Sequence, residues 1–346
     1  MKVLVTGASG FLGSHVVDRC LANGDSVRVL VRKGSDLSYL RTLPGIDIAV
    51  GELGDDVGLN DAAADVDVVY HSAARVGERG TRGDYVRDNL LGTQHLVDAA
   101  RRCGVARFVL VSSPSVVGNG RDQPDLDESC PYPATFLNHY SETKALAEQR
   151  VLAANAPDFT TCAIRPRAVW GPRDRLGYLP RLVAKLLSGR LPDLSGGRPV
   201  TTSICYCDNA ADAIVRAGTA NANVVGGRAY FVTDRERIDT WEFLRKLAEI
   251  FDAPPIARRV SPTSAAVMAS VMDGVWRFPP LARRYPPPIS RYSLSLLTLT
   301  STYTLAAAER DLGYVPKVAL PTGLEKLRHW IDEIGGVDEY LRLVRS

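Results

Sequence analysis

The chain has 346 residues, of which 45% are hydrophobic and 23% charged, and its formal net charge is +3. This composition is ordinary for a globular protein with a sizeable core, and so small a charge without a basic, aromatic-rich run argues against nucleic acid as a partner. No apolar run reaches the ~18 residues that span a bilayer, and a strand begins directly after the first methionine, so no targeting segment is expected.

The six cysteines are scattered, and only Cys205 and Cys207 lie close together in the sequence. Neither a second pair nor a neighbouring histidine accompanies them, so no metal site is predicted. Several cysteines lie in apolar segments, where a free buried thiol is usual. This usage is typical of a reducing compartment, and we expect a cytoplasmic protein.

The N-terminal segment predicts a strand, a glycine turn and a helix. Lys2 to Val5 is the strand, and the helix is expected to run to about Asn23. The glycines between them follow a G-x-x-G-x-x-G spacing, which lets the backbone approach a pyrophosphate at a helix N-terminus. The alternative is a tight turn without a ligand. The predicted cofactor contacts of this turn are Gly7, Ser9, Gly10, Phe11, Leu12 and Gly13.

The end of the second strand, Ser26 to Val31, bears on the choice of cofactor. An acidic residue there would bind the ribose hydroxyls of NAD, whereas this strand ends in Arg32-Lys33, which suits a 2′-phosphate. NADP(H) is therefore the preferred cofactor, and NAD(H) stays open. The alternative interpretation is a pair of solvated loop cations.

Two further strands and a helix continue the alternation. Ile46 to Val50 and Val66 to His71 are apolar runs, and Asn89 to Arg102 is expected to be helical. This order predicts an α/β fold of the Rossmann type, with a doubly wound parallel sheet. His71 is expected to be a packed strand-end residue rather than a catalyst.

Residues after the third and fourth strands are expected to border the cofactor. Leu53 follows the third strand on the adenine side. Ala73 and Ala74 follow the fourth, where small side chains let a dinucleotide pass close to the backbone.

The stretch from Phe108 to Lys144 carries the candidate chemistry. A buried strand is predicted over Phe108 to Val111, and the hydroxyl of Ser113 follows it. Tyr140 and Lys144 begin an alanine-rich helix and, at i and i+4, share one of its faces. An exposed helix face is the alternative interpretation, because this spacing alone is common.

This arrangement suits proton transfer to a carbonyl oxygen. A lysine ammonium one turn away is expected to lower the pKa of the Tyr140 hydroxyl from ~10, so that it exchanges a proton near neutral pH. A serine hydroxyl from the neighbouring strand end can hold the same substrate oxygen. Only seven lysines occur in the chain against thirty-five arginines, so a lysine at this position is informative.

After a sixth strand, Thr160 to Ile164, the alternation loosens. We expect residues 1–172 to form the dinucleotide-binding domain, with returning segments near 202–220, and residues 173–346 to form mainly a smaller substrate lobe over the carboxyl ends of the strands. The lobe's expected elements are helices at 179–187, 208–219 and 240–251 and strands at 202–206 and 229–233, and helices at 306–314 and 324–334 are expected to close the chain at its surface.

An apolar helix is predicted over residues 264–276, with arginines on both sides. One interpretation is a helix that dips into a membrane surface or admits a greasy substrate. We favour the other, a lobe helix packed on the core, because the segment is short and its flanks are only modestly basic.

A series of motifs over nearly the whole chain resembles the extended short-chain dehydrogenases/reductases. These motifs are Thr6-Gly7-x-x-Gly10-x-x-Gly13, Ala73-Ala74, Asn89, Ser112-Ser113, Tyr140-x-x-x-Lys144, Arg165-Pro166 and Trp170-Gly171-Pro172. A narrower likeness is to the 3β-hydroxysteroid dehydrogenase-like branch, which includes bacterial 2-alkyl-3-oxoalkanoate reductases and sterol-4-carboxylate 3-dehydrogenases. It rests on Ser113-Pro114-Ser115-Val116-Val117, Asp127-Glu128-Ser129-x-Pro131-Tyr132-Pro133 and Leu312-Gly313-Tyr314-x-Pro316.

The resemblance implies roles for individual residues. Tyr140 would be the general acid for ketone reduction and the base for alcohol oxidation, and Lys144 would tune it and hold the nicotinamide ribose. Ser113 corresponds to the catalytic serine, with Ser115 as the alternative. The family pattern also places Asn89 and Pro166 among the cofactor contacts. Family members are often dimers through helices like those near residues 93 and 140, so a homodimer is an expectation, although the residues leave the oligomeric state open.

Two positions depart from the motifs of related enzymes and so reduce the range of reactions expected. Dehydratases of nucleotide sugars carry an Asp-Glu pair where this chain has Pro114-Ser115, and many epimerases carry an asparagine where it has Arg167-Ala168. Arg167 would lie beside the nicotinamide, where a guanidinium clamps a carboxylate bidentately. Ser115 and Arg167 are therefore the candidate substrate contacts. The alternative for Arg167 is an ion pair with Asp174 or another acid.

The leading hypothesis is an NADP(H)-dependent reductase or dehydrogenase that acts on a small hydrophobic ketone or secondary alcohol, such as a β-keto acid or a polyketide-like or sterol-like molecule. An NAD-dependent 3β-hydroxysteroid or sterol-carboxylate dehydrogenase is the first alternative. A nucleotide-sugar epimerase and a non-catalytic dinucleotide sensor are two more, and the Tyr140–Lys144 pair argues against the sensor.

Overall fold

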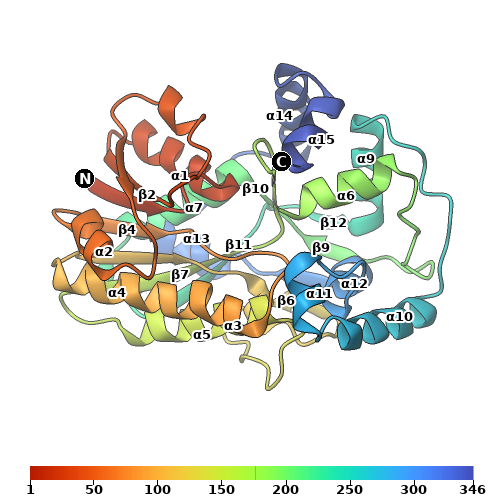
Figure 1. The fold of residues 1–346 in the computed structure, drawn as a ribbon, viewed down its shortest axis with the longest axis horizontal. Helices are drawn as coiled ribbons and strands as arrows, with labels where there is room; N and C mark the ends of the chain where they lie inside the picture. Colours follow the sequence, from red (N-terminus) through yellow and green to blue (C-terminus); the bar gives the residue numbers. More distant parts are fainter. Residues whose placement is uncertain (176, 346) are drawn as a thin grey trace.

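The computed structural model describes residues 1–175 and 177–345, and its centre is a seven-stranded sheet (Figure 1). All neighbouring strands are parallel, in the order β11-β7-β5-β4-β1-β2-β3. The strands are β1 (Lys2–Thr6), β2 (Ser26–Val31), β3 (Asp47–Val50), β4 (Val68–His71), β5 (Arg107–Val111), β7 (Thr160–Pro166) and β11 (Arg228–Val232). The predicted Rossmann-type parallel sheet is confirmed.

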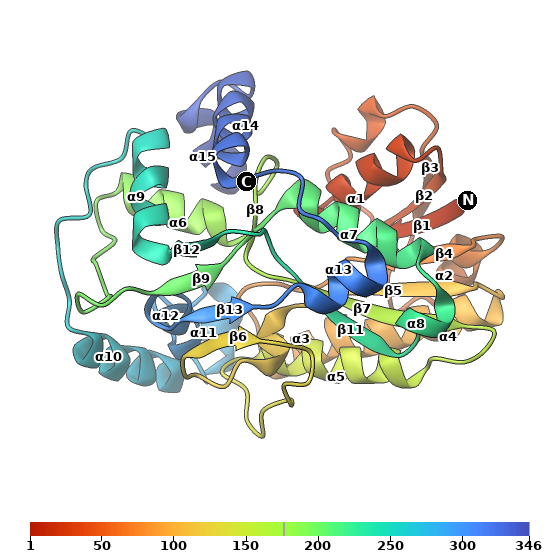
Figure 2. The same ribbon diagram turned by 180° about the vertical axis from the view of Figure 1, so that it is seen from behind.

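Helices cover both faces of this sheet, which is why its central strands are continuous apolar runs. One face carries α2 (Asp56–Ala63), α4 (Gly92–Arg102) and α5 (His139–Ala153); the other carries α1 (Phe11–Ala22) and α7 (Cys207–Thr219) (Figures 1 and 2). From β1 the chain proceeds outward to β2 and β3, and then returns to place β4 on the opposite side of β1. This reversal creates a crevice at the carboxyl ends of β1 and β4.

The strand predicted at 229–233 does not belong to the lobe, and that expectation was wrong. As β11 it forms the edge of the main sheet and pairs in parallel with β7, from Arg228 opposite Cys162 to Val232 opposite Pro166. Tyr230 and Val232 are buried on the face of β11 that helix α13 (Ala306–Leu312) covers, and Phe231 is buried on the other face, against Tyr303. Short helix α8 (Ala222–Val225) precedes this strand.

The smaller lobe is built on a four-stranded mixed sheet in the order β12-β9-β13-β6. These strands are β12 (Arg237–Asp239), β9 (Thr201–Ser203), β13 (Ser301–Tyr303) and β6 (Gln123–Leu126). Strand β6 was not predicted from the sequence, because its partner β13 is far away along the chain. A two-stranded ladder of β8 (Val169–Trp170) and β10 (Cys205–Tyr206) adjoins the lobe core around Trp170.

The rest of the described lobe is helical (Figures 1 and 2). Its helices are α6 (Tyr178–Leu187), α9 (Thr240–Ile250), α10 (Pro262–Val275), α11 (Pro279–Arg284), α12 (Arg291–Thr298), α14 (Leu320–Glu333) and α15 (Val337–Arg345). Helix α10 packs against α12 but buries only Ala265 and Ala269, so the favoured expectation of a core-packed helix holds for its alanine face alone. No helix within residues 1–175 and 177–345 is long and apolar enough to cross a membrane.

Short helical turns connect the main elements. They are η1 (Leu40–Thr42), α3 (Arg82–Tyr85), the π-helix η2 (Val86–Leu91) and η3 (Pro114–Val117). Helices α3 and η2 lead directly into α4 and pack against α5. A π-helical turn is rare and often marks a functional site, and this one adjoins α5, which carries Tyr140 in its first turn.

Candidate active site

The glycine turn after β1 packs more closely than any side chain would permit. Gly7 has φ +71°, and a Cβ at this residue would lie 2.7 Å from the backbone nitrogen of Ala73. A Cβ on Gly13 would lie 2.1 Å from the carbonyl oxygen of Gly7. Helix α1 begins after Gly10, which offers no side-chain cap, and its first turn contains no acidic residue. The N–H groups of that turn therefore fit an anionic pyrophosphate.

A cleft of about 2570 Å³ runs along the carboxyl ends of the strands, large enough for a dinucleotide and a substrate together. Most of the predicted site residues line it. They are Gly7, Ser9, Gly10, Phe11, Leu12, Gly13, Arg32, Leu53, Ala73, Ala74, Ser113, Tyr140, Lys144, Pro166 and Arg167. Lys33, Asn89 and Ser115, also predicted, lie outside this lining.

The end of β2 presents a cation to the cleft. Arg32 is exposed there and forms no ion pair with any residue that the structure describes. The nearby carboxylate of Asp36 is already paired with Arg175 at 2.8 Å. Lys33 is exposed in the same turn and does not line the cleft. The strand end therefore offers one guanidinium to a ligand.

Three side chains from two elements meet at the cleft floor. Ser113 caps η3, where its Oγ accepts from the backbone N–H of Ser115 at 3.2 Å, and its hydroxyl hydrogen-bonds Tyr140. Asn138 caps α5 and so fixes the first turn that carries Tyr140. Lys144 follows one turn later, and its Nζ donates to the carbonyl oxygen of Val111 at 2.5 Å. The predicted catalytic residues are thus brought together.

The electrostatics of this trio differ from the expectation. Burial raises the pKa of the Tyr140 hydroxyl, and the hydrogen bond from Ser113 opposes that rise only in part. Burial also lowers the pKa of Lys144 to about 8, against the pull of Glu148. The predicted net lowering of the Tyr140 pKa is therefore not found, because desolvation dominates at the tyrosine. A stabilising effect of the Lys144 ammonium on the phenolate stays a prediction. Tyr140 is protonated at neutral pH, as a general acid must be.

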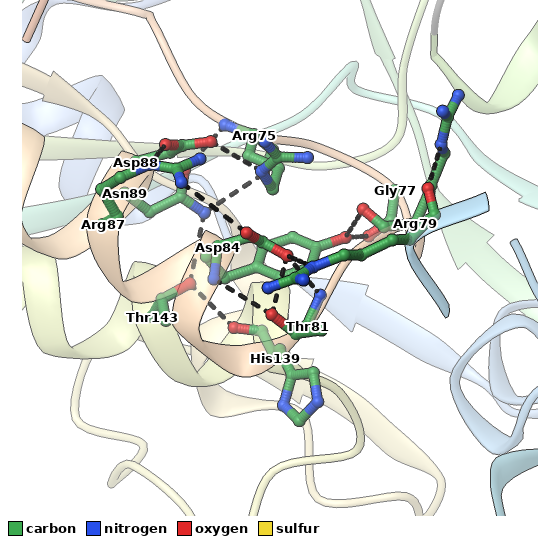
Figure 3. Close-up of polar contacts among 12 residues, drawn as sticks. Arg75, Gly77, Arg79, Thr81, Asp84, Arg87, Asp88, Asn89, His139 and Thr143 are labelled. Atoms are coloured by element: carbon green, nitrogen blue, oxygen red, sulfur yellow. Dashed lines mark hydrogen bonds and ion pairs between the residues drawn. The ribbon is translucent and has the colours of Figure 1, made fainter. Parts of the chain in front are cut away.

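Asn89 does not line the cleft, but it holds the loop that follows β4 in place (Figure 3). Its Oδ1 accepts from the backbone N–H of Arg75 at 2.7 Å, and its Nδ2 donates to the Arg75 carbonyl at 3.1 Å and to Thr143 Oγ1 at 3.2 Å. The Arg75 guanidinium in turn pairs with Asp88 at 2.6 Å. The amide of Asn89 therefore ties the loop after β4 to helix α5, which carries Tyr140.

A buried ion pair, not foreseen from the sequence, anchors α5 to β7. Arg165 Nη2 lies 2.6 Å from Glu148 Oε1, with the two side chains 4% and 0% exposed. The hydroxyl of Tyr132 donates to the same carboxylate oxygen at 2.7 Å, and the guanidinium lies 5.1 Å from the centre of the Phe231 ring. Glu148 is one turn beyond Lys144, so its i+4 spacing was a usable signal, but its partner lies on another element.

Arg167 is buried and has no acidic partner among residues 1–175 and 177–345. Its Nη2 donates to Thr202 Oγ1 at 3.3 Å, and its Nε makes no hydrogen bond. The alternative of an ion pair is therefore not observed. Ala168, directly after it, has φ +43°, an uncommon conformation for a non-glycine residue that costs about 1–3 kcal/mol and clusters at functional sites.

A second, small cavity of about 40 Å³ lies between η3 and α12. Three buried polar atoms without hydrogen-bond partners belong to residues that line it: Ser115 Oγ, Ser141 Oγ and Arg167 Nε. Tyr292 of α12 lines both this cavity and the large cleft, and burial raises the pKa of its hydroxyl. Sequence reasoning missed Tyr292 and Ser141, because α12 was not predicted and a serine has no distinctive pattern.

Two other groups near the cleft are already hydrogen-bonded within the protein. His71, as expected, is a packed strand-end residue: its ring nitrogens lie 2.7 Å from Thr6 Oγ1 and 2.9 Å from Thr93 Oγ1, and burial lowers its pKa to about 3.

Cys207 lies near a histidine in the folded chain, since ligand atoms of His15, Cys207 and Asp208 fall within 4.8 Å of one another. However, His15 is bonded to Asp208 at 2.9 Å and to the Pro172 carbonyl at 3.0 Å, which accounts for this cluster without a metal.

The glycine turn beneath a dinucleotide-sized cleft and the serine–tyrosine–lysine trio on its floor define an enzyme class. This is an extended short-chain dehydrogenase/reductase, which exchanges a hydride between a nicotinamide dinucleotide and its substrate. The chain belongs to the 3-beta hydroxysteroid dehydrogenase/isomerase family, whose model matches residues 4–260.

Relatives within this family differ in substrate. The chain is 35% identical to a 2-alkyl-3-oxoalkanoate reductase of Stenotrophomonas maltophilia, over 95% of this chain and 98% of that protein. It is 35% identical to a 4-hydroxy-2-methyl-3-oxo-4-farnesyl-3,4-dihydroquinoline-1-oxide ketoreductase of Stigmatella aurantiaca, over 95% and 96%. It is also 32% identical to a 3-beta-hydroxysteroid dehydrogenase of Mycolicibacterium neoaurum, over 91% and 87%.

Solved structures share the whole fold. That of gox2253 is 25% identical, with a TM-score of 0.78 over 96% of this chain and 98% of that one. A UDP-glucuronic acid 4-epimerase from Bacillus cereus, in complex with NAD, is 21% identical, with a TM-score of 0.72 over 97% and 98%. At that identity the likeness to the epimerase concerns the fold alone.

Proposed function

We propose that this enzyme is an NADP(H)-dependent reductase of a ketone on a hydrophobic, carboxylated substrate such as a β-keto acid. The observation that carries the proposal is the pairing, in one cleft, of a protonated Tyr140 with a buried Arg167 that has no acidic partner in the described part of the chain. The first group suits reduction of a carbonyl, and the second suits a carboxylate beside it.

Each residue of the trio has a separate task at the reacting oxygen. When bound, the nicotinamide supplies the hydride to the carbonyl carbon. The Ser113 hydroxyl holds the carbonyl oxygen, and Tyr140, already hydrogen-bonded to Ser113, donates its proton to it. The Lys144 ammonium, one helical turn away, stabilises the resulting phenolate. In the oxidative direction the same phenolate accepts the proton from the alcohol.

The small cavity supports a carboxylate as the second feature of the substrate. A carboxylate bound there would satisfy Arg167 Nε and the hydroxyls of Ser115 and Ser141, the three buried atoms that lack partners. One relative points the same way, since by its name it reduces 2-alkyl-3-oxoalkanoates, which carry a carboxylate. The ketoreductase relative supports reduction of a ketone but not the carboxylate. The 3-beta-hydroxysteroid dehydrogenase relative favours a second candidate, NAD-dependent oxidation of a sterol-like alcohol.

Cofactor preference separates the two candidates. We expect titration of the intrinsic fluorescence at matched ionic strength to show tighter binding of NADPH than of NADH. Arg32→Ala should weaken NADPH binding by about tenfold or more, because it removes a charge-assisted hydrogen bond to the 2′-phosphate, and leave NADH unchanged. Arg41→Ala, an exposed arginine of η1 outside the cleft, is the matched control. Equal or tighter NADH binding would favour the dehydrogenase.

A further inference from the structure

Helix α10 exposes an apolar stripe that nothing in the described chain covers. The stripe consists of Val267, Met268, Val271, Val275 and, just past the helix, Phe278, each 47–63% exposed. The buried residues Ala265 and Ala269 lie on the opposite side, against α12. The remaining side carries the polar residues Thr263, Ser270 and Asp273. The apolar stripe is therefore a separate face of the helix that the rest of the lobe leaves uncovered.

The exposed apolar side chains are concentrated in this segment. Residues 267–285 contain six of the twelve large hydrophobic side chains that are exposed in the described chain, with Tyr285 as the sixth. Single exposed hydrophobic residues need no explanation, whereas a contiguous group marks an interaction surface. Figures 1 and 2 show α10 on the outer edge of the lobe, far from the α2 end of the main sheet.

The charged residues around α10 indicate what kind of partner the apolar stripe contacts. Between residues 254 and 285 the chain has five arginines and one acid, Asp273, which pairs with Arg291 at 2.8 Å. Arg283 pairs with Asp84, whereas the other four form no ion pair among residues 1–175 and 177–345. These four are exposed and flank α10 on both sides in the chain: Arg258, Arg259, Arg277 and Arg284. A second copy of the chain docked face to face would set arginines against arginines, so the surface fits an anionic bilayer instead.

We propose that the apolar stripe of α10 and its flanking arginines dock the enzyme on an anionic lipid membrane. The apolar side chains would enter the boundary between headgroups and acyl chains, and the guanidiniums would bind the phosphates. The segment leads directly into the active site: Arg283 of α11 and Pro286, Pro287 and Pro288 line the cleft. Docking therefore places the mouth of the cleft beside the bilayer, from which a hydrophobic substrate can be taken. The docking itself does not depend on which substrate is reduced.

Co-sedimentation with vesicles tests the proposal. The full chain should bind vesicles of phosphatidylcholine mixed with phosphatidylglycerol, and bind pure phosphatidylcholine far less, with binding falling as salt is added. The double variant Val271→Ser/Phe278→Ser should lose about tenfold or more of the partition coefficient, since each change removes apolar area from the contact. Its turnover of a water-soluble ketone should equal that of the wild type, because neither residue lines the cleft.

A matched control and a second readout make the outcome decisive. Val57→Ser/Val315→Ser alters two exposed valines outside the patch, 70% and 51% exposed, and should bind like the wild type. Trp276 ends α10, where its Nε1 donates to the Tyr285 carbonyl at 2.9 Å, so brominated lipid should quench its fluorescence and Trp276→Phe should abolish most of that quenching. Failure to bind anionic vesicles, or equal loss in the control, overturns the proposal. Self-association that only the stripe variant loses would instead assign the stripe to a subunit interface, and the membrane proposal would be wrong.

Discussion

The two halves of this enzyme meet at one cleft but are built on different principles. On the side of the main sheet, the binding surface is largely backbone: glycines, alanines and the uncapped N-terminus of α1. On the lobe side it is made of side chains from distant segments, such as Arg167, Thr202 and Tyr292. The first arrangement accepts one invariant ligand part, a pyrophosphate, and tolerates almost no change. The second suits recognition of a substrate through a few polar groups, which can vary while the fold persists.

The largest effect on stability is expected from the buried ion pair that joins α5 to the main sheet. Glu148→Gln leaves the buried Arg165 without its counter-charge, and we expect a loss of about 3–5 kcal/mol in the free energy of unfolding, measured with urea. Glu142, also on α5, forms a more exposed pair with Arg82 of α3, and Glu142→Gln should cost less than about 1 kcal/mol. Equal losses in the two variants would contradict the structural role given to the buried pair.

The glycine turn after β1 should bind the dinucleotide poorly once a side chain is added to it. Gly13→Ala places a methyl group 2.1 Å from the Gly7 carbonyl oxygen, so we expect cofactor binding to weaken by about tenfold or more, as measured by fluorescence titration. Gly274→Ala is the control, because an added Cβ there meets nothing within 4 Å. Unchanged affinity in the Gly13 variant would show that the turn does not hold the dinucleotide.

A substitution on the lobe side of the cleft should weaken the binding only of substrates that carry a carboxylate. Arg167→Met should raise KM for a β-keto acid by about tenfold to a hundredfold, the worth of a hydrogen bond to a charged group. The corresponding β-keto ester, which carries no carboxylate, should show little change in KM, and kcat should hold for both. A similar loss with the ester would mean that Arg167 supports the fold of the pocket rather than binding a carboxylate.

A smaller effect is expected from pH. Burial lowers the pKa of Lys144 to about 8, so its ammonium is present below that pH and is lost as the pH rises through it. Because the ammonium stabilises the Tyr140 phenolate, kcat for reduction should fall about tenfold per pH unit above this value. Lys144→Met should be slower at every pH and show no such fall. A wild-type profile that stays flat through pH 8 would exclude this role.

The main sheet and the grouping of Ser113, Tyr140 and Lys144 could be predicted from the sequence, because their signals are local. A glycine spacing, a strand end and an i, i+4 pair each occupy a few consecutive residues. The strand at 228–232 was misplaced because a short apolar strand carries no mark of the sheet it joins. Similarly, Glu148 and Asn89 act through partners on other elements, 17 and 14 residues away, and Tyr292 faces the cleft from a helix far along the chain, so placing them required the fold.

Desolvation was the other quantity that the sequence could not supply. The spacing of Tyr140 and Lys144 indicated the pair correctly, but the direction of the tyrosine's pKa shift depends on how deeply both groups are buried. The same holds for α10, where the sequence indicated an apolar helix but not which of its faces is covered.

The most direct test of the central claim is the oxidation of NADPH by a 2-alkyl-3-oxoalkanoate, followed by absorbance in the wild type and in Tyr140→Phe. The account predicts turnover by the wild type and a loss of about 10²–10⁴-fold in kcat for the variant, with NADPH binding retained, because only the proton donor is removed. Turnover that is unchanged in Tyr140→Phe would contradict the assignment of Tyr140 as the general acid and, with it, the proposed reaction.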